Sequence, residues 1–306
     1  MKLLITAAFN GDESFYSELR KVGYEIVFIN DEKADLKKQG VLAEEIDGVI
    51  CNGLFLYNDI EKFSSLKFIQ LTSAGLDRVP VEYIKGKGIK LFNAKGVYGI
   101  PMAEYAVCGV LQLYKNTDFF YENQRKGVWQ KNRNLLELYG KTVCVFGCGN
   151  VGYECAKRFK ALGCKVIGLD IFPYESDSFD YIKRADEYEE VFSESDIVVL
   201  TAPLTEKTEN FIDSEKIRAM KDGCVIVNVS RGKVIDEKSL IDGLNGKLGG
   251  AVLDVFNEEP LSPNSPLWKM KNVIVTPHNS FVGDGNDERL KALILKNLTD
   301  LRKQGE

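Results

Sequence analysis

The chain of 306 residues contains a single histidine, and its seven cysteines form no C-x-x-C pair. Structural zinc sites are built from several closely spaced Cys and His side chains, so we expect no zinc site and no other bound metal. The cysteines are odd in number and lie within apolar strand or helix patterns, which does not suit a disulfide framework. We therefore expect buried free thiols.

Long apolar runs and clusters of basic residues are also missing. No stretch approaches the roughly 18 continuous apolar residues that a membrane-spanning helix needs. The N-terminal residues 1–8 are apolar over too few positions for a signal peptide and indicate a first strand. A net charge of −5 with dispersed lysines gives no general attraction to nucleic acid or to an anionic membrane. We expect a soluble cytoplasmic protein with neither of these partners.

Short apolar runs alternate with amphipathic segments in the first hundred residues. This alternation predicts a parallel sheet covered by helices on both faces, in a small flavodoxin-like domain. The expected strands are 3–7, 25–29, 48–51, 68–71 and 89–92, and the expected helices are 13–21 and 81–85.

The alternation resumes after residue 141 and predicts a six-stranded dinucleotide-binding domain. Its expected strands are 143–146, 165–169, 197–202, 224–229, 250–255 and 273–276, and its expected helices are 151–162, 214–221 and 236–245. A helix at 101–114 is expected at the domain junction, and a final helix at 285–303 is expected to return to the first domain.

The fold class is therefore predicted as α/β with two doubly wound parallel-sheet domains. A Rossmann dinucleotide-binding domain, residues 100–280, is expected to be inserted into a flavodoxin-like substrate-binding domain made of residues 1–99 and 281–306. Between the two sheets, residues 119–138 are rich in aromatic and charged side chains without a clear strand pattern. This segment is either an arm packed on a partner subunit or a surface helix and loop, and its aromatic and arginine residues favour an interface.

Three glycines in the middle of the chain have G-x-G-x-x-G spacing, directly after the strand 143–146. In a dinucleotide-binding turn the first glycine permits a sharp turn, the second lets the backbone approach a pyrophosphate, and the third lets the helix pack on the sheet. The phosphates then lie at the helix N-terminus. The candidate cofactor loop comprises Gly147, Gly149, Asn150, Val151 and Gly152.

Asp170 ends the next strand, about twenty residues after the glycine loop, where a carboxylate can hydrogen-bond the adenosine ribose hydroxyls. Residues 171–173 contain no arginine to pair with a 2′-phosphate. NAD is therefore expected over NADP. The plain alternative is a loop or helix-cap carboxylate.

Ligands in open parallel sheets bind beyond the carboxyl ends of the strands. Arg231, Glu259 and His278 each follow a different strand of the second sheet. Alone, each has an ordinary alternative as a surface cation, a solvated acid or a loop histidine. Together they suit hydride transfer, in which His exchanges a proton, Glu orients the imidazole and Arg binds a substrate carboxylate. Further strand-end residues expected along the cofactor are Ala202, Pro203, Val229, Ser230, Asp254 and Ser280.

Segments that contain these three residues resemble the signature motifs of the D-isomer-specific 2-hydroxyacid dehydrogenases. They are VNVSRG at 227–232, LDVFNEEP at 253–260 and TPH at 276–278. The resemblance extends to MAEY at 102–105, ELYGKT at 137–142, APLT at 202–205 and MKDG at 220–223, so it covers nearly the whole chain in the family's order. Phosphoglycerate dehydrogenases and hydroxypyruvate reductases are members of this family.

The resemblance implies that Arg231 binds the substrate carboxylate and carbonyl, that His278 is the general acid and base, and that Glu259 supports the imidazolium. It also implies that the loop with Ser73, Ala74 and Gly75 offers backbone N–H groups to the carboxylate across an interdomain cleft. Family members generally form homodimers through the dinucleotide domain. The expected reaction interconverts a small 2-keto acid, such as hydroxypyruvate, glyoxylate or pyruvate, and its D-2-hydroxy acid.

Two departures from the family pattern concern the substrate. After His278 the chain reads NSFVGDGN at 279–286, where many members have a run of small residues. The chain also ends soon after its last expected helix, without the regulatory extension of many phosphoglycerate dehydrogenases. A phosphoglycerate dehydrogenase lacking that domain and an NAD-sensing, corepressor-like interaction protein remain alternatives. A formate dehydrogenase is disfavoured because that branch has Gln in place of Glu259.

Overall fold

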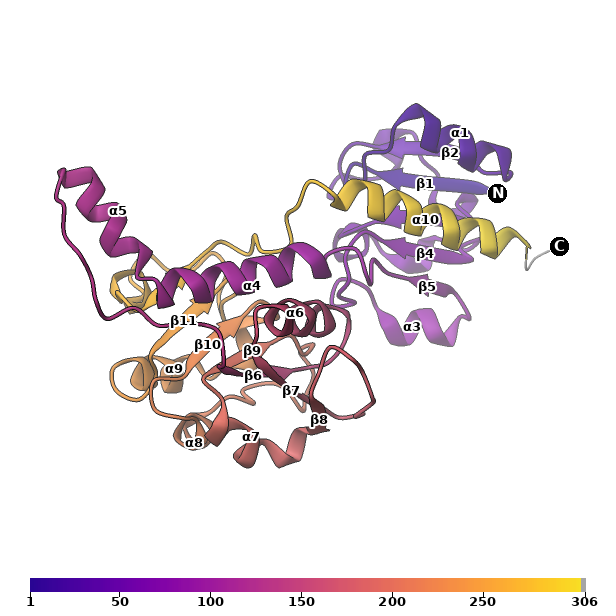
Figure 1. Ribbon diagram of the computed structural model, residues 1–306. Coiled ribbons are helices and arrows are strands. Elements are labelled where there is room, and N and C mark those ends of the chain that lie inside the picture. The colour runs from indigo at the N-terminus through magenta and orange to yellow at the C-terminus, as the bar shows by residue number, and fades with distance from the viewer. Residues whose placement is uncertain (304–306) are drawn as a thin grey trace. The chain divides into compact units, whose positions relative to one another are not determined.

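The computed structural model describes residues 1–303, which divide into two compact units. Unit 1 consists of Met1–Tyr98 together with the segment that begins at Gly283, and unit 2 is Gly99–Val282 (Figure 1). Each unit contains one sheet, in which every strand pairing is parallel. The predicted α/β class with two parallel-sheet domains is confirmed.

Unit 1 has a five-stranded sheet in the order β2-β1-β3-β4-β5, which is the flavodoxin-like order. Its strands are β1 (Lys2–Thr6), β2 (Glu25–Ile29), β3 (Gly48–Cys51), β4 (Phe68–Leu71) and β5 (Lys90–Phe92). Its α-helices are α1 (Glu13–Lys21), α2 (Leu54–Tyr57), α3 (Val81–Gly86) and α10 (Asn286–Lys303).

Alternating side chains of the central strand β1 explain why helices cover both faces of this sheet. Leu3 and Ile5 point into a core that includes three leucine or isoleucine side chains of α10, whereas Leu4 points into the core beneath α2 and α3. The apolar stripe of α10 is Leu290, Ile294 and Leu298, so the C-terminal helix completes the sheet that the N-terminus begins. Asp12 caps α1 by accepting a hydrogen bond from the amide of Phe15.

Unit 2 has a seven-stranded sheet in the order β12-β11-β10-β9-β6-β7-β8, the doubly wound order of dinucleotide-binding domains with one added edge strand. Its strands are β6 (Thr142–Phe146), β7 (Lys165–Asp170), β8 (Tyr181–Arg184), β9 (Ile197–Leu200), β10 (Val225–Asn228), β11 (Gly250–Leu253) and β12 (Val273–Val275). Its α-helices are α4 (Gly99–Tyr114), α5 (Thr117–Lys126), α6 (Asn150–Ala161), α7 (Tyr188–Glu194), α8 (Ser214–Ala219) and α9 (Glu237–Leu244).

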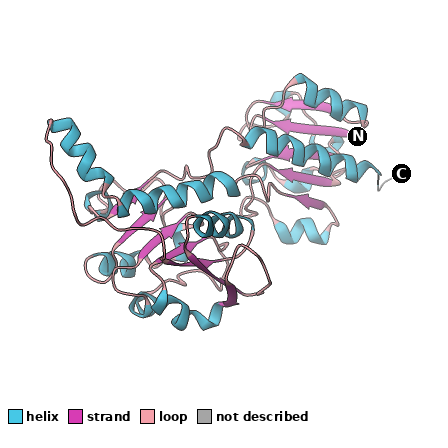
Figure 2. Ribbon diagram, viewed as in Figure 1, coloured by secondary structure: helices cyan, strands magenta, loops and turns pink. Residues whose placement is uncertain are grey.

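Helices cover both faces of the seven-stranded sheet (Figure 2). On β6, Val143 and Val145 point towards α4 and α6, whereas Cys144 and Phe146 point towards α7, α8 and α9. Both faces are therefore apolar, which is why the strands read as continuous hydrophobic runs rather than as alternating patterns.

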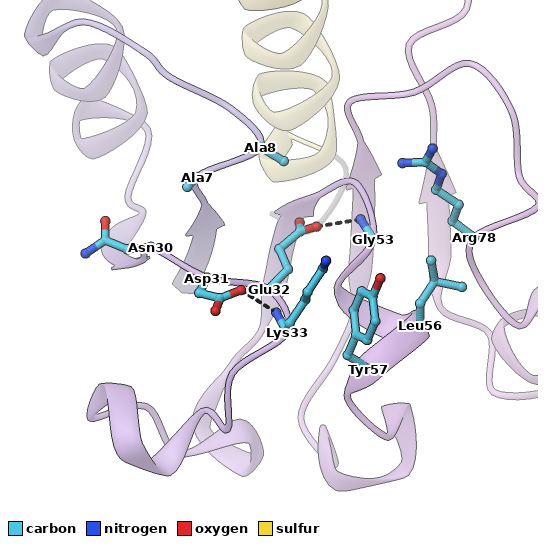
Figure 3. Close-up of a pocket in the computed structure, with 10 residues that line it drawn as sticks. All are labelled: Ala7, Ala8, Asn30, Asp31, Glu32, Lys33, Gly53, Leu56, Tyr57 and Arg78. Carbon is cyan, nitrogen blue, oxygen red and sulfur yellow. Dashed lines mark hydrogen bonds between the residues drawn. The ribbon is translucent and has the colours of Figure 1, made fainter. Parts of the chain in front are cut away.

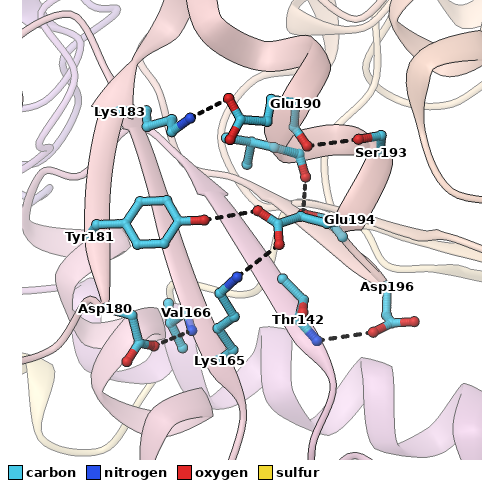
Figure 4. A network of polar contacts seen from close by, with 12 residues as sticks. Thr142, Lys165, Val166, Asp180, Tyr181, Lys183, Glu190, Ser193, Glu194 and Asp196 are labelled. Carbon is cyan, nitrogen blue, oxygen red and sulfur yellow. Dashed lines mark hydrogen bonds and ion pairs between the residues drawn. The ribbon is translucent and has the colours of Figure 1, made fainter.

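The prediction of six strands for this sheet is wrong, because β8 forms a seventh. Its sequence, YIKR, contains three polar or charged residues in four and gives no apolar run. Pairing with β7 and contacts with α7 hold it instead: the Tyr181 hydroxyl donates to Glu194 at 2.8 Å, and Lys183 pairs with Glu190 (Figure 4). Exposed charges of this kind are typical of an edge strand.

The aromatic segment forms helix α5 followed by residues without regular secondary structure up to about Leu138. No residue of α5 is buried, and the helix extends away from the rest of unit 2 (Figure 1). All seven cysteines are free thiols and six of them are buried, as predicted, but the prediction of burial is wrong for Cys108, whose helix α4 leaves it exposed. In the described part of the chain, no helix is long and apolar enough to cross a membrane.

Candidate active site

The carboxyl ends of five strands of unit 2 lie in register along one edge of the sheet. Phe146 pairs with Leu200, Leu200 with Asn228, Asn228 with Leu253, and Leu253 with Val275. The residues that follow these strands therefore gather at a single edge. This row brings together the glycine loop and the loops that carry Arg231, Glu259 and His278.

The glycine loop has the geometry expected for pyrophosphate binding. Gly147 has a φ of +95°, and a side chain there would lie 2.5 Å from the amide nitrogen of Ala202. A Cβ atom at Gly152 would lie 2.1 Å from the Gly147 carbonyl oxygen, so the start of α6 packs directly on the turn. Gly149 has open space around its Cα and precedes Asn150 and Val151 in the first turn of α6. The backbone is therefore accessible at the position where the dipole of a twelve-residue helix favours an anion.

Asp170 is fixed beside this loop at the end of β7. Its Oδ2 accepts a hydrogen bond from the Cys148 amide at 2.7 Å, and its Oδ1 accepts one from the Phe172 amide at 3.0 Å. Each carboxylate oxygen has a second lone pair, so the group can also accept from two ribose hydroxyls. The loop and this carboxylate together fit the phosphate and ribose groups of NAD.

Arg231 follows β10 in a turn that Asn228 shapes. The Asn228 side chain accepts from the amide and hydroxyl of Ser230 and donates to the Arg231 carbonyl. The next residue, Gly232, lies so close to the loop after β11 that a Cβ atom would be 1.9 Å from the Phe256 carbonyl carbon. Only glycine fits there, and the close approach holds the Arg231 loop against the loop that leads to Glu259.

Glu259 and His278 form a direct pair. Glu259 Oε2 lies 2.8 Å from Nδ1 of His278, and its Oε1 accepts from the Phe256 amide at 3.1 Å. The carboxylate is therefore held by its own loop while it orients the imidazole, leaving Nε2 as the nitrogen on the other side of the ring. Both side chains are a little over one-third exposed, so a ligand can reach them.

Asp254 fixes the backbone on which His278 lies. Its buried carboxylate accepts from the Thr276 hydroxyl at 2.6 Å and from the amides of Asn279 and Ser280 at 2.8 Å each. The His278 amide donates to the Asp254 carbonyl at 2.7 Å, and His278 adopts a φ of +51°, a left-handed conformation that is uncommon for non-glycine residues but that histidine adopts more often than most. The loop contacts therefore hold the backbone of His278 in this conformation.

The structure brings together the other residues predicted to line the cofactor in unit 2. Ala202 contacts the glycine turn, Pro203 follows it as an exposed residue, and Val229 and Ser230 lie between β10 and Arg231. Sequence reasoning missed the shaping role of Asn228 and the contact of the Tyr105 hydroxyl with Thr276. Both residues lie within motifs quoted above, VNVSRG and MAEY, but the motifs do not reveal these contacts, because each contact depends on a partner set by the folded backbone.

Ser73, Ala74 and Gly75 lie in unit 1, in the loop after β4. Their carbonyls accept hydrogen bonds from Ala94, Asn93 and the Ser73 hydroxyl, respectively. Within residues 1–303, none of the three backbone amides has an acceptor. The amides are therefore available to an anion, as in other anion-binding turns.

Unit 1 also contains a cavity of about 460 Å³ at the carboxyl ends of β1, β2 and β3 (Figure 3). Glu32 anchors its wall by accepting from the Thr6 hydroxyl at 2.6 Å and from the amides of Asn52 and Gly53 at 2.8 and 2.7 Å. The lining carries both acids and cations, including Lys33 and Arg78. Its mixed charge gives no preference for a cationic or an anionic ligand.

The comparisons agree with this geometry. The family described as "D-isomer specific 2-hydroxyacid dehydrogenase, NAD binding domain" matches residues 107–280. D-3-phosphoglycerate dehydrogenase of Methanocaldococcus jannaschii is 39% identical over 76% of this chain, although the match spans only 44% of that relative. Hydroxypyruvate reductase of Blautia hydrogenotrophica is 29% identical over 99% of this chain and 97% of its own length.

Among solved structures, D-lactate dehydrogenase of Aquifex aeolicus, complexed with NAD and lactic acid, is similar with a TM-score of 0.80. It is 26% identical to this chain, and the match covers 99% of this chain and 96% of that one. The family match covers more than half of the chain, and its range contains the glycine loop, Arg231, Glu259 and His278. The protein belongs to the family of NAD-dependent D-isomer-specific 2-hydroxyacid dehydrogenases.

Proposed function

We propose that this protein interconverts a small 2-keto acid and its D-2-hydroxy acid, with His278 as the general acid and base. The observation that carries the proposal is the Glu259–His278 pair at the sheet edge that also holds the glycine loop. The glycine loop and Asp170 would hold NADH, which when bound would provide the hydride that the carbonyl carbon accepts. His278 gives a proton to the carbonyl oxygen from Nε2, and in the reverse direction it takes that proton from the hydroxyl. Glu259 stabilises the imidazolium and holds its orientation.

Arg231 and the loop after β4 bind the substrate carboxylate in this proposal. A guanidinium presents parallel N–H donors that match a carboxylate and can polarise the neighbouring carbonyl. The unengaged amides of Ser73, Ala74 and Gly75 support a second contact with the same group. Unit 1 is accordingly assigned to the substrate and unit 2 to the cofactor.

The cofactor is assigned as NAD rather than NADP. Asp170 adds a negative charge where NADP carries its 2′-phosphate, and residues 171–173 provide no cation to offset it. The free cysteine thiols support a reducing compartment, the cytoplasm. The exposed aromatic side chains of residues 119–138 support a homodimer that forms through unit 2.

The experiment that tests the catalytic assignment is His278→Ala. We expect turnover to fall by about 10²- to 10⁴-fold, the usual contribution of a general acid or base, while NADH binding stays within about twofold. Stopped-flow and steady-state NADH oxidation measure turnover, and fluorescence titration measures binding. Glu259→Gln is the matched variant, since it keeps a hydrogen-bonding side chain but removes the charge, and we expect a smaller loss. An unchanged kcat in His278→Ala would refute the role of His278.

The substrate is identified by an NADH-oxidation screen. The panel contains hydroxypyruvate, glyoxylate, pyruvate and a phosphorylated 2-keto acid, and so includes the substrate classes of relatives named as phosphoglycerate dehydrogenase, hydroxypyruvate reductase and glyoxylate reductase. The proposal expects at least one of these to turn over with a kcat/KM far above the others. Tight NADH binding without turnover of any 2-keto acid would favour the NAD-sensing alternative instead.

A further inference from the structure

The backbone N–H and carbonyl of Cys148, inside the glycine loop, form hydrogen bonds with Asp170, the last residue of β7, and with Tyr174, which follows β7. Its N–H donates to Asp170 Oδ2 at 2.7 Å, and its carbonyl accepts a hydrogen bond from the Tyr174 hydroxyl at 2.6 Å. The Cys148 side chain points into the core, against Gly168, where a Cβ atom would lie 2.5 Å from Sγ. The Cys148 thiol therefore packs in the core, whereas the backbone of Cys148 connects the glycine loop to Asp170 and Tyr174.

The short segment between these two contacts is exposed and apolar. Ile171 and Phe172 are 58% and 77% exposed, and the Phe172 amide donates to Asp170 Oδ1. Tyr174 closes the segment, with its ring packed edge-on against Phe179 at a centroid distance of 6.5 Å. Partial burial raises the pKa of Tyr174, so the phenol stays protonated and remains a donor near neutral pH. The segment 171–174 is thus fixed at one end by Asp170 and at the other by Tyr174.

We propose that Tyr174 is a positioning residue for the adenosine half of NAD. Its hydroxyl ties the segment after β7 to the glycine loop, and so it holds the Asp170 carboxylate at a constant distance from the turn that receives the pyrophosphate. The adenosine ribose and the pyrophosphate are joined by a short covalent linkage, which limits the distance between them, so both groups bind well only when the two loops keep a matching spacing. The inference concerns cofactor binding and does not depend on which 2-keto acid reacts.

A purely structural role for Tyr174 predicts a different result from a positioning role. Tyr174→Phe keeps the ring and its contact with Phe179 but removes the donor to Cys148. If the hydroxyl only supported folding, the variant would weaken the binding of every part of the cofactor alike. If it positions the adenosine site, the loss is confined to ligands that contain adenosine.

The test compares Tyr174→Phe with wild type in binding NADH, ADP-ribose and reduced nicotinamide mononucleotide. We expect the Kd of NADH and of ADP-ribose to rise by about two- to tenfold, the effect of one hydrogen bond, and the Kd of the mononucleotide to stay unchanged. At saturating NADH, kcat should also stay unchanged while the KM for NADH rises. Tyr139→Phe is the matched control, because Tyr139 lies in the same unit with an exposed side chain.

An unchanged Kd for ADP-ribose in Tyr174→Phe would overturn the proposal, and so would an equal weakening of the mononucleotide. Wild-type protein provides a second measurement that needs no variant. ADP-ribose should slow amide hydrogen exchange both in residues 147–152 and in residues 171–175. Protection of the glycine loop alone would count against a connection between the two segments.

Discussion

Asp170 is the residue on which the choice between NAD and NADP depends. Its carboxylate lies at the end of β7 and is held by the amides of Cys148 and Phe172. Hydrogen bonds from two ribose hydroxyls to a charged group are each stronger than a neutral pair. We expect Asp170→Ala to raise the KM for NADH by about ten- to a hundredfold and to relax the preference over NADPH. Steady-state kinetics with both cofactors measure the ratio.

The control for this prediction is Asp170→Asn, which keeps an acceptor for one of the two amides but removes the charge. The asparagine variant should gain the ability to use NADPH, and it should disturb the glycine loop less than the alanine variant does. A wild-type protein that used NADH and NADPH equally well would contradict the assignment of Asp170.

Some residues of the candidate site can be located from the sequence pattern, and others cannot. Asp170, Arg231 and His278 follow strands, so the register of apolar runs locates them before the fold is known. Asn228 and Tyr174 act on carbonyl groups of Arg231 and Cys148. Every residue has a backbone carbonyl, so the sequence does not show which carbonyl the side chain of Asn228 or Tyr174 contacts. The positions of the candidate site residues at the strand ends were therefore predictable from the sequence, and the contacts that support them were not.

Among the secondary-structure elements, apolar strands with full burial were predicted to within a few residues. β3 and β9 are wholly buried, and their apolar residues form continuous runs in the sequence. β8 was missed because an edge strand depends on its neighbour rather than on its own pattern. α7 was missed for a similar reason, since its seven residues include three glutamates and bury only Val191 and Phe192.

The close approach of the loops after β10 and β11 is possible only because residue 232 is a glycine. A Cβ atom at Gly232 would lie 1.9 Å from the Phe256 carbonyl carbon, so Gly232→Ala must push apart the loops of Arg231 and Glu259. We expect a loss of about 1–3 kcal/mol in the free energy of unfolding, together with a large fall in kcat/KM. Gly246→Ala is the matched control, with no atom within 4 Å of its Cβ, and should change stability by less than about 0.5 kcal/mol. Equal stability of the two variants in urea denaturation would refute this account.

Asp196 joins the N-terminal ends of β6, β9 and β10. Its Oδ2 accepts from the Thr142 amide at 3.0 Å (Figure 4), and its Oδ1 accepts from Lys221 at 2.7 Å. Burial raises the pKa of Asp196, but these hydrogen bonds and the charges of Lys141 and Lys221 outweigh it, so the pKa lies below its usual 3.8. A carboxyl whose pKa is lower in the folded state stabilises the fold above its unfolded pKa, and this contribution is lost as pH falls through the folded value.

We therefore expect Asp196→Asn to be less stable than wild type at pH 7, by about 1–2 kcal/mol. The difference should shrink as the pH falls below about 4, because wild type then protonates and loses the same contribution. Urea denaturation between pH 2.5 and 7 measures this. Asp242→Asn, which changes an exposed carboxylate on α9, should show a difference that is small at every pH. A difference in the free energy of unfolding between Asp196→Asn and wild type that stays constant from pH 2.5 to 7 would contradict the stabilising role of the Asp196 carboxylate.

On the scale of the whole molecule, one set of exposed apolar side chains in unit 2 lies on α5 and the residues after it. Trp129 is 96% exposed, and Tyr121, Val128 and Leu136 are also exposed. The same unit has an apolar groove of about 560 Å³ along α4 and α6, with Val107, Leu111 and Leu162 in its lining. Exposed apolar patches of this extent are characteristic of surfaces that associate. In the proposed homodimer, a second copy of the chain would supply both complementary parts, since each copy would have one arm and one groove.

We accordingly expect the wild-type protein to be a dimer and the double variant Tyr121→Ser with Trp129→Ser to dissociate to monomers at micromolar concentration. Two large aromatic side chains are the kind of anchor that dominates an interface, so their loss should raise the dimer Kd by at least about a hundredfold. Light scattering coupled to size-exclusion chromatography, over a dilution series, measures the mass. Leu42→Ser, an exposed apolar position in unit 1, is the control and should leave the dimer intact. A monomeric wild type, or a double variant that stays dimeric, would show that the arm does not hold subunits together.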